Sequence, residues 1–264
     1  MARPQPQIIG NATLYSADCF KVAPLLDAVD HVITDPPYER VMHDSKNGQK
    51  GLVRPDGSHH WTRLDFEPID EIREKVVELG RLATGWFLAF CTAEGVGRWA
   101  DAVNASDLKY KRACVWVKPD ATPQMNGQGP AMGAEMFICA WAGDGHARWN
   151  AGGKRGVYTH LQNPPDRGSY ARLKTERHPT EKPRRLMSEL IADFTNPGDV
   201  VFDPFMGVGT TGVAALMAGR RFIGCETNPM WFEFAKKRIE DAQRQSDFFI
   251  EPPPEKLKKP ARIL

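Results

Sequence analysis

Cysteine is scarce in this sequence, and none of it is arranged as a metal or disulfide motif. Five cysteines are spread over 264 residues, and no Cys-x-x-Cys pair occurs among them. A structural zinc site and a disulfide framework are therefore not expected. Dispersed free cysteines are typical of proteins in a reducing compartment, so we expect this protein to be cytoplasmic.

Long apolar runs and a large net charge are missing too. No stretch approaches the roughly 18 apolar residues that a membrane-spanning helix requires. Residues 1–9 lack the basic and apolar segments of a signal peptide. The formal net charge is only +2, so a nucleic-acid surface would have to be local. Composition thus argues against membrane and disulfide-stapled proteins, and it leaves the chemistry open.

The chain does contain an alternation of short apolar strands and amphipathic helices. We predict strands at residues 12–16, 31–34, 86–90, 114–117, 136–141, 200–203 and 222–226. Helices are predicted at residues 19–26, 95–105, 183–194, 210–218 and 230–244, and one more starts at an Asp70 N-cap. This alternation predicts one compact α/β domain with a doubly wound sheet.

Three long polar stretches interrupt the alternation, at residues 39–63, 119–133 and 143–177. Loops of this length in a compact domain usually have a function. We divide the chain into a first half at residues 1–142, an insertion at 143–177, a second half at 178–245 and a flexible tail at 246–264.

Residues 200–212 combine a strand, a tight glycine turn and the start of a helix. Gly207, Gly209 and Gly212 have the spacing of a dinucleotide-binding loop, in which missing side chains let the backbone approach a ligand. Glu226 ends the next strand, where a carboxylate can accept hydrogen bonds from two ribose hydroxyls. Taken alone, the glycines are equally compatible with a strand–helix connection that binds nothing.

An NAD-dependent oxidoreductase would use a similar turn. Here Asp203 and Pro204 place an acid and a rigid kink before the first glycine. A carboxylate at this position would repel a pyrophosphate but attract a cationic group. S-adenosylmethionine carries a sulfonium and an ammonium group, so the acid favours this cofactor over NAD.

Asp35-Pro36-Pro37-Tyr38 directly follows the predicted strand at residues 31–34. The two prolines fix the backbone and remove both N–H donors, so the turn offers acceptors only. The Asp35 carboxylate and the Pro36 carbonyl form an acceptor pair at the carboxyl end of a strand, where α/β active sites usually lie. An ordinary proline-rich turn is the alternative interpretation.

This acceptor pair suits an exocyclic amino group of a nucleic-acid base. The lone pair of adenine N6 is delocalised into the ring, and two acceptors that bind both N–H groups can redirect it toward a methyl donor. The Tyr38 ring would hold a base that has been flipped out of the helix. The predicted catalytic residues are Asp35, Pro36, Pro37 and Tyr38.

Together these motifs resemble the amino-methyltransferase family of prokaryotic and phage DNA methyltransferases. The similarity is to the circularly permuted β class, in which Asp-Pro-Pro-Tyr precedes the cofactor glycine turn, and it extends from about Leu14 to Ile239. It implies a Rossmann-like fold, S-adenosyl-L-methionine as cofactor, base flipping of double-stranded DNA and a setting such as restriction–modification. Members are often dimeric, which adds a homodimer to the expectations. Transfer from a sulfonium needs no metal, and none is expected.

The resemblance also implies roles for single residues. Asp18 would contact the adenine of the cofactor and Glu226 its ribose. Thr180 and Lys182, in the stretch His-Pro-Thr-Glu-Lys-Pro, would bind its methionine carboxylate. Lys118 and Glu135 belong to a region similar to the one behind the catalytic pocket. The predicted cofactor-binding residues are Asp18, Cys19, Asp35, Thr180, Lys182, Asp203, Phe205, Gly207, Gly209, Thr210, Thr211, Glu226 and Thr227.

In this family the target-recognition region precedes the His-Pro-Thr motif, which here means residues 143–177. Seven basic and three acidic residues occur there, interleaved with Trp149, Tyr158 and Tyr170. Basic residues among aromatic ones suit phosphate contacts and base readout, although a charge-rich solvated loop has the same composition. The predicted DNA-binding residues are Arg148, Lys154, Arg155, Arg167, Arg172 and Lys174.

Within the family, Asp at the first catalytic position goes mostly with adenine and Ser mostly with cytosine N4. The resemblance therefore favours N6 of adenine, with cytosine N4 as the alternative. Methylation at carbon 5 of cytosine needs a nucleophilic cysteine, typically after proline, and no cysteine here follows a proline. A DNA-binding regulator without turnover is disfavoured by the intact Asp35, Tyr38, Gly207 and Glu226.

Overall fold

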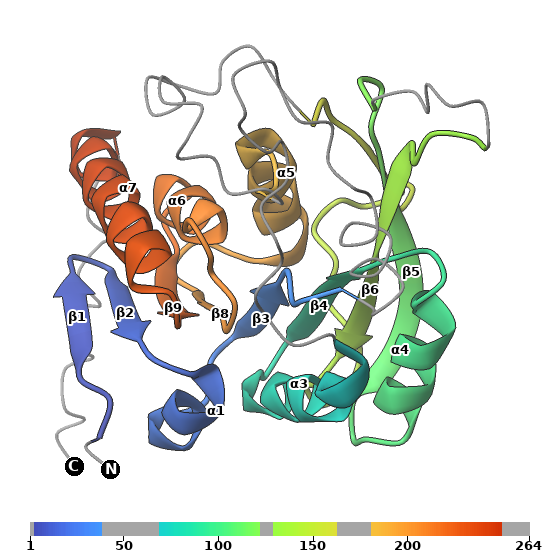
Figure 1. Cartoon of the computed structure of the whole chain (residues 1–264), viewed down its shortest axis with the longest axis horizontal. Helices are drawn as coiled ribbons and strands as arrows, with labels where there is room; N and C mark the ends of the chain where they lie inside the picture. Colours follow the sequence, from blue (N-terminus) through green and yellow to red (C-terminus); the bar gives the residue numbers. More distant parts are fainter. Residues whose placement is uncertain (1–2, 39–68, 122–128, 163–180, 250–264) are drawn as a thin grey trace, which may run out of the picture.

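The chain folds around one mixed β-sheet in the computed structural model, which describes residues 3–38, 69–121, 129–162 and 181–249. Within these ranges the strand order is β1-β2-β9-β8-β3-β4-β6-β5-β7 (Figure 1). The strands are β1 (Pro6–Ile9), β2 (Ala12–Ser16), β3 (His31–Thr34), β4 (Trp86–Cys91), β5 (Lys109–Val117), β6 (Ala134–Trp141), β7 (Val157–Thr159), β8 (Val200–Asp203) and β9 (Arg221–Glu226).

The centre of the sheet is parallel and its margins are mixed. β2, β9, β8, β3 and β4 run parallel to one another. β1 pairs antiparallel with β2, and β6 lies antiparallel between β4 and β5. Parallel neighbours need crossover connections, which the helices between them provide.

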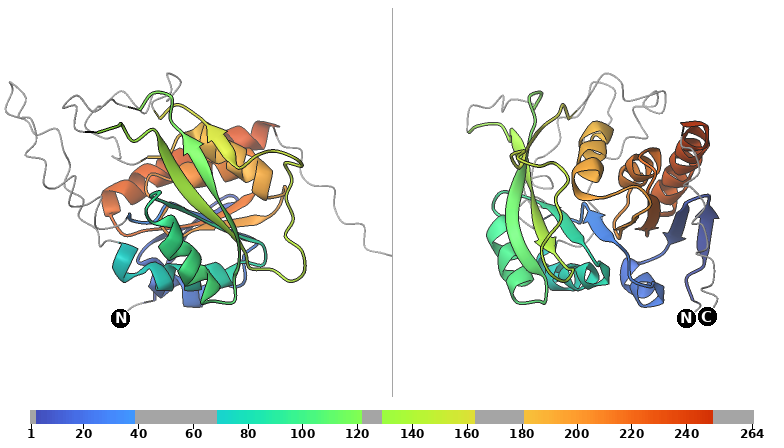
Figure 2. Two further views of the ribbon diagram at one scale, coloured as in Figure 1. Left: turned by 90° about the vertical axis from the view of Figure 1, so that its right-hand side faces the viewer. Right: turned by 180° about the vertical axis from the view of Figure 1, so that it is seen from behind.

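Helices cover both faces of this sheet. The helices α1 (Cys19–Val22), α3 (Arg73–Leu79) and α4 (Val96–Asn104) lie on one face, and α5 (Arg184–Phe194), α6 (Thr210–Met217) and α7 (Pro229–Phe249) lie on the other, as Figure 1 and Figure 2 show. In β4, Leu88 and Phe90 belong to the core under α5–α7, whereas Phe87 and Ala89 belong to the opposite core. This two-sided burial confirms the predicted doubly wound fold and explains why β4 is apolar throughout. Among the described helices, none has the length and apolar composition needed to cross a membrane.

Several element boundaries differ from the sequence prediction. Asp70 is not an N-cap, because it lies in the 3-10 turn Ile69–Glu71 and its carboxylate pairs with Arg73 and Arg98. The last helix, α7, continues to Phe249 and so takes in the start of the predicted tail. The strands β1 and β7 are not predicted at all. With three residues, β7 is too short for alternation to reveal it.

Two connections leave the middle of the sheet in opposite directions. From β8 the chain passes through α6 to β9, whereas from β3 it reaches β4 on the other side by way of α3. Ligand sites of open α/β sheets form where the strand order reverses, beyond the carboxyl ends of the strands. The ends of β3 and β8 therefore mark the expected site, and both predicted motifs begin there.

Candidate active site

Four neighbouring strands carry a carboxylate at or just beyond their carboxyl ends. Glu226 is the last residue of β9 and Asp203 the last of β8, while Asp35 directly follows β3 and Asp18 follows β2 by two residues. The parallel register brings these ends to one edge of the sheet. An edge with this many carboxylates suits a cationic ligand.

The Asp35 carboxylate has one anchored oxygen and one without a partner. Its Oδ2 accepts a hydrogen bond from Lys182 Nζ at 2.6 Å. Its Oδ1 is buried and has no hydrogen-bond partner in the described part of the chain. Burial raises the pKa of Asp35 above its ordinary value, although the Lys182 ammonium opposes this shift. A buried acceptor without a partner is costly, so Oδ1 indicates a ligand that supplies an N–H or O–H group.

Lys182 lies at the centre of a buried polar network. Its Nζ is 2.6 Å from Asp35 Oδ2, 2.9 Å from the Tyr38 hydroxyl and 3.2 Å from Glu135 Oε2. Its side chain is 6% exposed, and Nζ lies 4.9 Å from the centre of the Phe90 ring. Burial acts to lower the pKa of Lys182, but the two carboxylates outweigh it and raise the pKa. The ammonium is therefore charged and held by protein groups.

Glu135, on β6, is the second carboxylate of the network. It accepts hydrogen bonds from the Tyr38 hydroxyl at 2.6 Å and from Lys118, which directly follows β5. Burial acts to raise its pKa, yet Lys182 and Lys118 together hold the pKa at about 2. Burial and the nearby carboxylates raise the pKa of Tyr38 well above its ordinary value, so the phenol stays protonated and donates. The sequence analysis places Lys118 and Glu135 behind the catalytic pocket, and the structure shows that both belong to the network around Asp35.

The glycine turn follows β8, as the sequence predicts. Gly207 has φ +50° and Gly209 has φ +76°, in the left-handed region that favours glycine. Gly209 occupies the N-cap of α6, and a Cβ there would lie 3.1 Å from the Ala235 Cβ in α7. The turn thus presents backbone at the edge of the sheet, as a cofactor loop requires.

Asp203 and Glu226 are held by neutral donors. Asp203 Oδ1 accepts from the Thr34 hydroxyl at 2.8 Å and from the Phe205 amide at 3.1 Å. Glu226 Oε1 accepts from the Asn228 amide at 2.7 Å. Burial raises the pKa of Asp203 to about 6 and also raises the pKa of Glu226. Among the ion pairs of the described residues, none joins either acid to a lysine or arginine.

The other residues predicted to bind the cofactor lie along the same edge or within its supports. Asp18 caps α1 by accepting from the Phe20 amide at 2.9 Å. Burial raises the pKa of the adjacent Cys19 thiol to about 12, so it stays a neutral thiol. The Phe205 ring meets Phe20 edge to face at 6.5 Å. Thr210 and Thr211 are buried at the start of α6, Thr227 is exposed, and Thr180 lies outside the described residues.

Glu181, next to Lys182, contacts the helices α6 and α7 and not the network around Asp35. Its Oε1 accepts from the Thr210 hydroxyl at 3.2 Å and pairs with Arg238 of α7 at 3.0 Å. Arg238 in turn donates to the Val208 carbonyl at 2.8 Å. The two adjacent residues therefore join the glycine turn to the network around Asp35, a link that the sequence analysis does not predict.

Comparison with known proteins settles the family. A model of N6/N4 DNA methylases matches residues 29–237. The chain belongs to the N6/N4 DNA methylase family. The type II methyltransferase M2.LlaDCHI of Lactococcus lactis subsp. cremoris is 26% identical over 249 residues, which cover 87% of this chain and 89% of the relative. DNA adenine methyltransferase YhdJ of Escherichia coli (strain K12) is 34% identical over 110 residues, covering 36% of this chain and 37% of the relative.

A solved relative agrees with the family and the fold. The crystal structure of the M1.HpyAVI–SAM complex is 27% identical and has a TM-score of 0.65, with 86% of this chain and 98% of the other covered. The predicted membership in this family and the Rossmann-like fold are therefore confirmed.

The structure separates the basic residues that the sequence assigns to DNA in this methylase. The Arg148 carbonyl accepts a hydrogen bond from Trp86 Nε1 at 2.6 Å, and Trp86 is the first residue of β4. Arg148 therefore lies near the amino ends of the parallel strands, whereas Asp35 lies at their carboxyl ends. Lys154 pairs with Glu189 and Asp193 of α5. Arg155 is exposed just before β7. The remaining predicted DNA contacts, Arg167, Arg172 and Lys174, lie outside the described residues.

Of the aromatic residues in the predicted recognition region, Tyr158 belongs to the core of the methylase and Trp149 packs against that core. Tyr158 is 1% exposed and donates to Asp193 at 2.9 Å. Trp149 packs edge to face on Phe194, with ring centres 4.8 Å apart. Their sequence context resembles a base-reading loop, but Tyr158 fills the space between β7 and α5 and Trp149 covers Phe194 at the end of α5. Arg184, exposed in the first turn of α5 and two residues after Lys182, is a basic candidate that the sequence analysis does not include.

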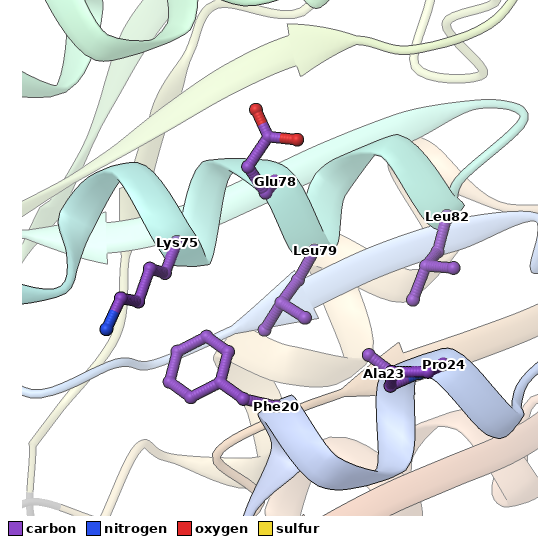
Figure 3. A pocket seen from close by; sticks show the side chains of 7 residues that line it. All are labelled: Phe20, Ala23, Pro24, Lys75, Glu78, Leu79 and Leu82. Carbon is purple, nitrogen blue, oxygen red and sulfur yellow. The ribbon is translucent and has the colours of Figure 1, made fainter.

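An open cavity of about 380 Å³ lies between α1 and α3 (Figure 3). Phe20 and Leu79 face each other across it, and its walls include none of the network around Asp35 and none of the glycine turn. We therefore place the active site of the methylase at the strand ends and not in this cavity. Within the described ranges, no cluster of three or more His, Cys, Asp or Glu side chains could hold a metal ion.

Proposed function

We propose that this protein transfers a methyl group from S-adenosylmethionine to N6 of adenine in double-stranded DNA. The observation that carries the proposal is the Asp35 carboxylate, with Oδ2 fixed by Lys182 and Oδ1 buried without a partner. An exocyclic amino group supplies the N–H donor that Oδ1 lacks. The similarity to YhdJ, named a DNA adenine methyltransferase, supports adenine as the base.

The chemistry follows from how Asp35 is held. When bound, S-adenosylmethionine supplies an electrophilic methyl group on its sulfonium. Asp35 Oδ1 accepts one N–H of the amino group, which draws the nitrogen lone pair out of the ring and makes it available for attack. Direct transfer forms the N–C bond, breaks the S–C bond and leaves one proton to be removed from the nitrogen. We assign that proton to Asp35, whose pKa burial raises.

The acidic edge supports this cofactor. Asp203 and Glu226 have raised pKa values, and in the described part of the chain no protein cation neutralises them. A sulfonium and an ammonium group would supply the missing positive charge, whereas a pyrophosphate would meet repulsion. We assign Glu226 to the ribose hydroxyls and Asp18 to the adenine of the cofactor.

The DNA surface lies on the same edge in this proposal. Arg184, exposed in the first turn of α5, is assigned to a phosphate contact. Arg155 is exposed before the amino end of β7 and stays a predicted contact. Arg167, Arg172 and Lys174 stay predicted contacts of the segment between Arg155 and Arg184. The proposal also includes a homodimer, in which one chain reads DNA while the other methylates it. It further places the protein in the cytoplasm.

The test is to express the protein in a bacterial host that lacks DNA methylation and to sequence the modified bases. We expect N6-methyladenine at one short sequence, and none with Asp35→Ala. N4-methylcytosine would correct the base and keep the reaction class. The absence of any modified base with purified protein, cofactor and DNA would overturn the proposal.

A further inference from the structure

The resemblance assigns Lys182 to the methionine carboxylate of the cofactor, but its surroundings indicate another role. An ammonium group has three N–H donors. Three protein oxygens, from Asp35, Tyr38 and Glu135, lie within 3.2 Å of Nζ and account for all of them. A cofactor carboxylate would have to displace one of these bonds at a side chain that is only 6% exposed. Such a displacement would leave a buried acceptor unpaired.

We propose that Lys182 and Glu135 are positioning residues for the catalytic carboxylate of Asp35, a role that rests on the proposed function. Lys182 fixes Oδ2, and this leaves Oδ1 as the oxygen presented to the target amino group. Glu135 fixes Lys182 in turn, and it is anchored from the other side by Lys118.

Removing any one member of this network should destabilise it strongly. It contains two buried lysines and two largely covered carboxylates, whose side chains are 22% (Asp35) and 14% (Glu135) exposed, together with the Tyr38 hydroxyl that bridges Lys182 and Glu135. Removing one partner of a buried ion pair leaves an uncompensated charge, which costs more than the pair contributes. The arrangement thus holds Asp35 in one orientation, which a catalytic acceptor needs.

Lys182 and Glu135 act on Asp35 with opposite signs. The Lys182 charge lowers the pKa of Asp35, whereas the Glu135 charge raises it. The other titratable groups that face this network are Tyr38 beside Asp35, Cys91 of β4, Lys118 just after β5 and Asp203 of β8. Asp35 must be ionised to accept the amino group, so turnover should rise with pH through its pKa. Lys182→Met should move that midpoint to higher pH, and Glu135→Gln should move it to lower pH.

The experiment combines a pH profile with cofactor affinity. Transfer of tritium-labelled methyl from S-adenosylmethionine to unmethylated bacterial DNA is measured from about pH 5 to about pH 10, and cofactor affinity by calorimetry. For Lys182→Met we expect turnover to be lowered by at least ~10² near neutral pH. At pH values below the shifted midpoint, turnover of this variant should rise about tenfold for each unit by which the pH is increased. Cofactor affinity should change by less than about twofold. For Glu135→Gln we expect lower turnover with the opposite shift.

Two further variants complete the test. Lys182→Arg keeps the charge, so its pH midpoint should stay near that of the wild type, while its planar head lowers turnover. If Lys182→Met does not fold, the midpoint shift of Glu135→Gln carries the test. Glu181→Gln changes the adjacent residue, which binds Arg238 and Thr210, and should leave the midpoint in place.

The outcomes distinguish the positioning role of Lys182 from the proposed methyltransferase function. A loss of about tenfold or more in cofactor affinity with an unshifted midpoint would return Lys182 to the cofactor and overturn its positioning role. Unshifted midpoints in both Lys182→Met and Glu135→Gln would overturn it as well. In either case an active wild-type protein leaves the proposed function intact. Absence of methyl transfer by the wild type would instead contradict the function itself.

Discussion

Two parts of the same sheet edge hold their carboxylates in opposite ways. At the catalytic end, formed by Asp35, Glu135 and their lysine partners, each acid is paired with a buried ammonium group. At the cofactor end, formed by Asp203 and Glu226, the acids are held by hydroxyl and backbone N–H groups. Within the described ranges, no lysine or arginine pairs with the acids of the cofactor end.

The difference shows which charges the protein neutralises itself. Lysine partners hold the pKa of Glu135 at about 2, and the Lys182 charge opposes the rise that burial causes in the pKa of Asp35. Among the described residues of the cofactor end, nothing of this kind opposes burial, which lifts the pKa of Asp203 to about 6. An acid that must stay ionised in one orientation needs a fixed counter-ion. An acid that binds a cationic ligand must keep its charge available for that ligand. The two ends thus differ in the source of the counter-ion: lysine side chains supply it at the catalytic end, and we assign it to the cofactor at the other end.

Replacing Asp35 should give the largest effect, because it removes the only catalytic acceptor with a free oxygen that we identify. We expect Asp35→Ala to lower turnover by at least ~10²–10³, as the loss of one preorganised transition-state hydrogen bond does. Cofactor affinity should stay nearly constant, since the cofactor end is intact. Single-turnover methylation and calorimetry measure the two quantities. Near-normal turnover would break the distinction between the two ends.

Replacing Glu226 should affect the other end alone. A carboxylate that bonds ribose hydroxyls contributes about 1.5–3 kcal/mol per charged contact. Glu226→Ala should therefore weaken binding of S-adenosylmethionine by roughly 10- to 150-fold, with turnover at saturating cofactor much less affected. Calorimetry with cofactor alone provides the measurement, and an unchanged dissociation constant would mean that Glu226 does not contact the ribose.

The pH dependence of cofactor binding should sharpen the comparison. Asp203, with a pKa of about 6, is neutral below that pH and negative above it. Affinity for the cationic S-adenosylmethionine should therefore fall by up to about tenfold as pH is lowered through this value. Asp203→Asn should remove the dependence. S-adenosylhomocysteine, which lacks the sulfonium charge, is the control ligand and should show a weaker dependence. Equal dependence for both ligands would argue against an electrostatic origin.

The smallest expected effect is on the salt dependence of DNA binding, and it compares two arginines at opposite ends of the parallel strands. Arg184 adjoins the network around Asp35, whereas Arg148 lies near the amino end of β4. Both are exposed, so Arg184→Ala and Arg148→Ala remove the same charge at matched sites. We expect Arg184→Ala to flatten the salt dependence of DNA binding by about 0.9 units of log–log slope and Arg148→Ala to leave it unchanged. The reverse result would move the DNA surface to the other edge.

The local sequence is sufficient where burial or backbone geometry dictates residue type. β4 is apolar because both of its faces are covered, and the glycine turn needs positive φ at Gly207 and Gly209. The buried strand and the strand–turn–helix around the glycines are both predicted from the sequence, and the structure contains both. The prediction is weaker where a residue's role depends on a distant partner. Lys154 has the composition of a DNA contact but pairs with α5, and Tyr158 has the composition of a base reader but is buried.

The sequence by itself determined the family, the doubly wound sheet and the two motifs at its edge, because strand alternation and short-range turn chemistry are properties of neighbouring residues. Only the tertiary structure decided how the carboxylates are compensated. Asp35 and Lys182 are 147 residues apart in the chain, and Tyr38 and Glu135 are 97 apart. Whether a buried acid keeps its charge depends on which groups surround it in space, and no local pattern records that.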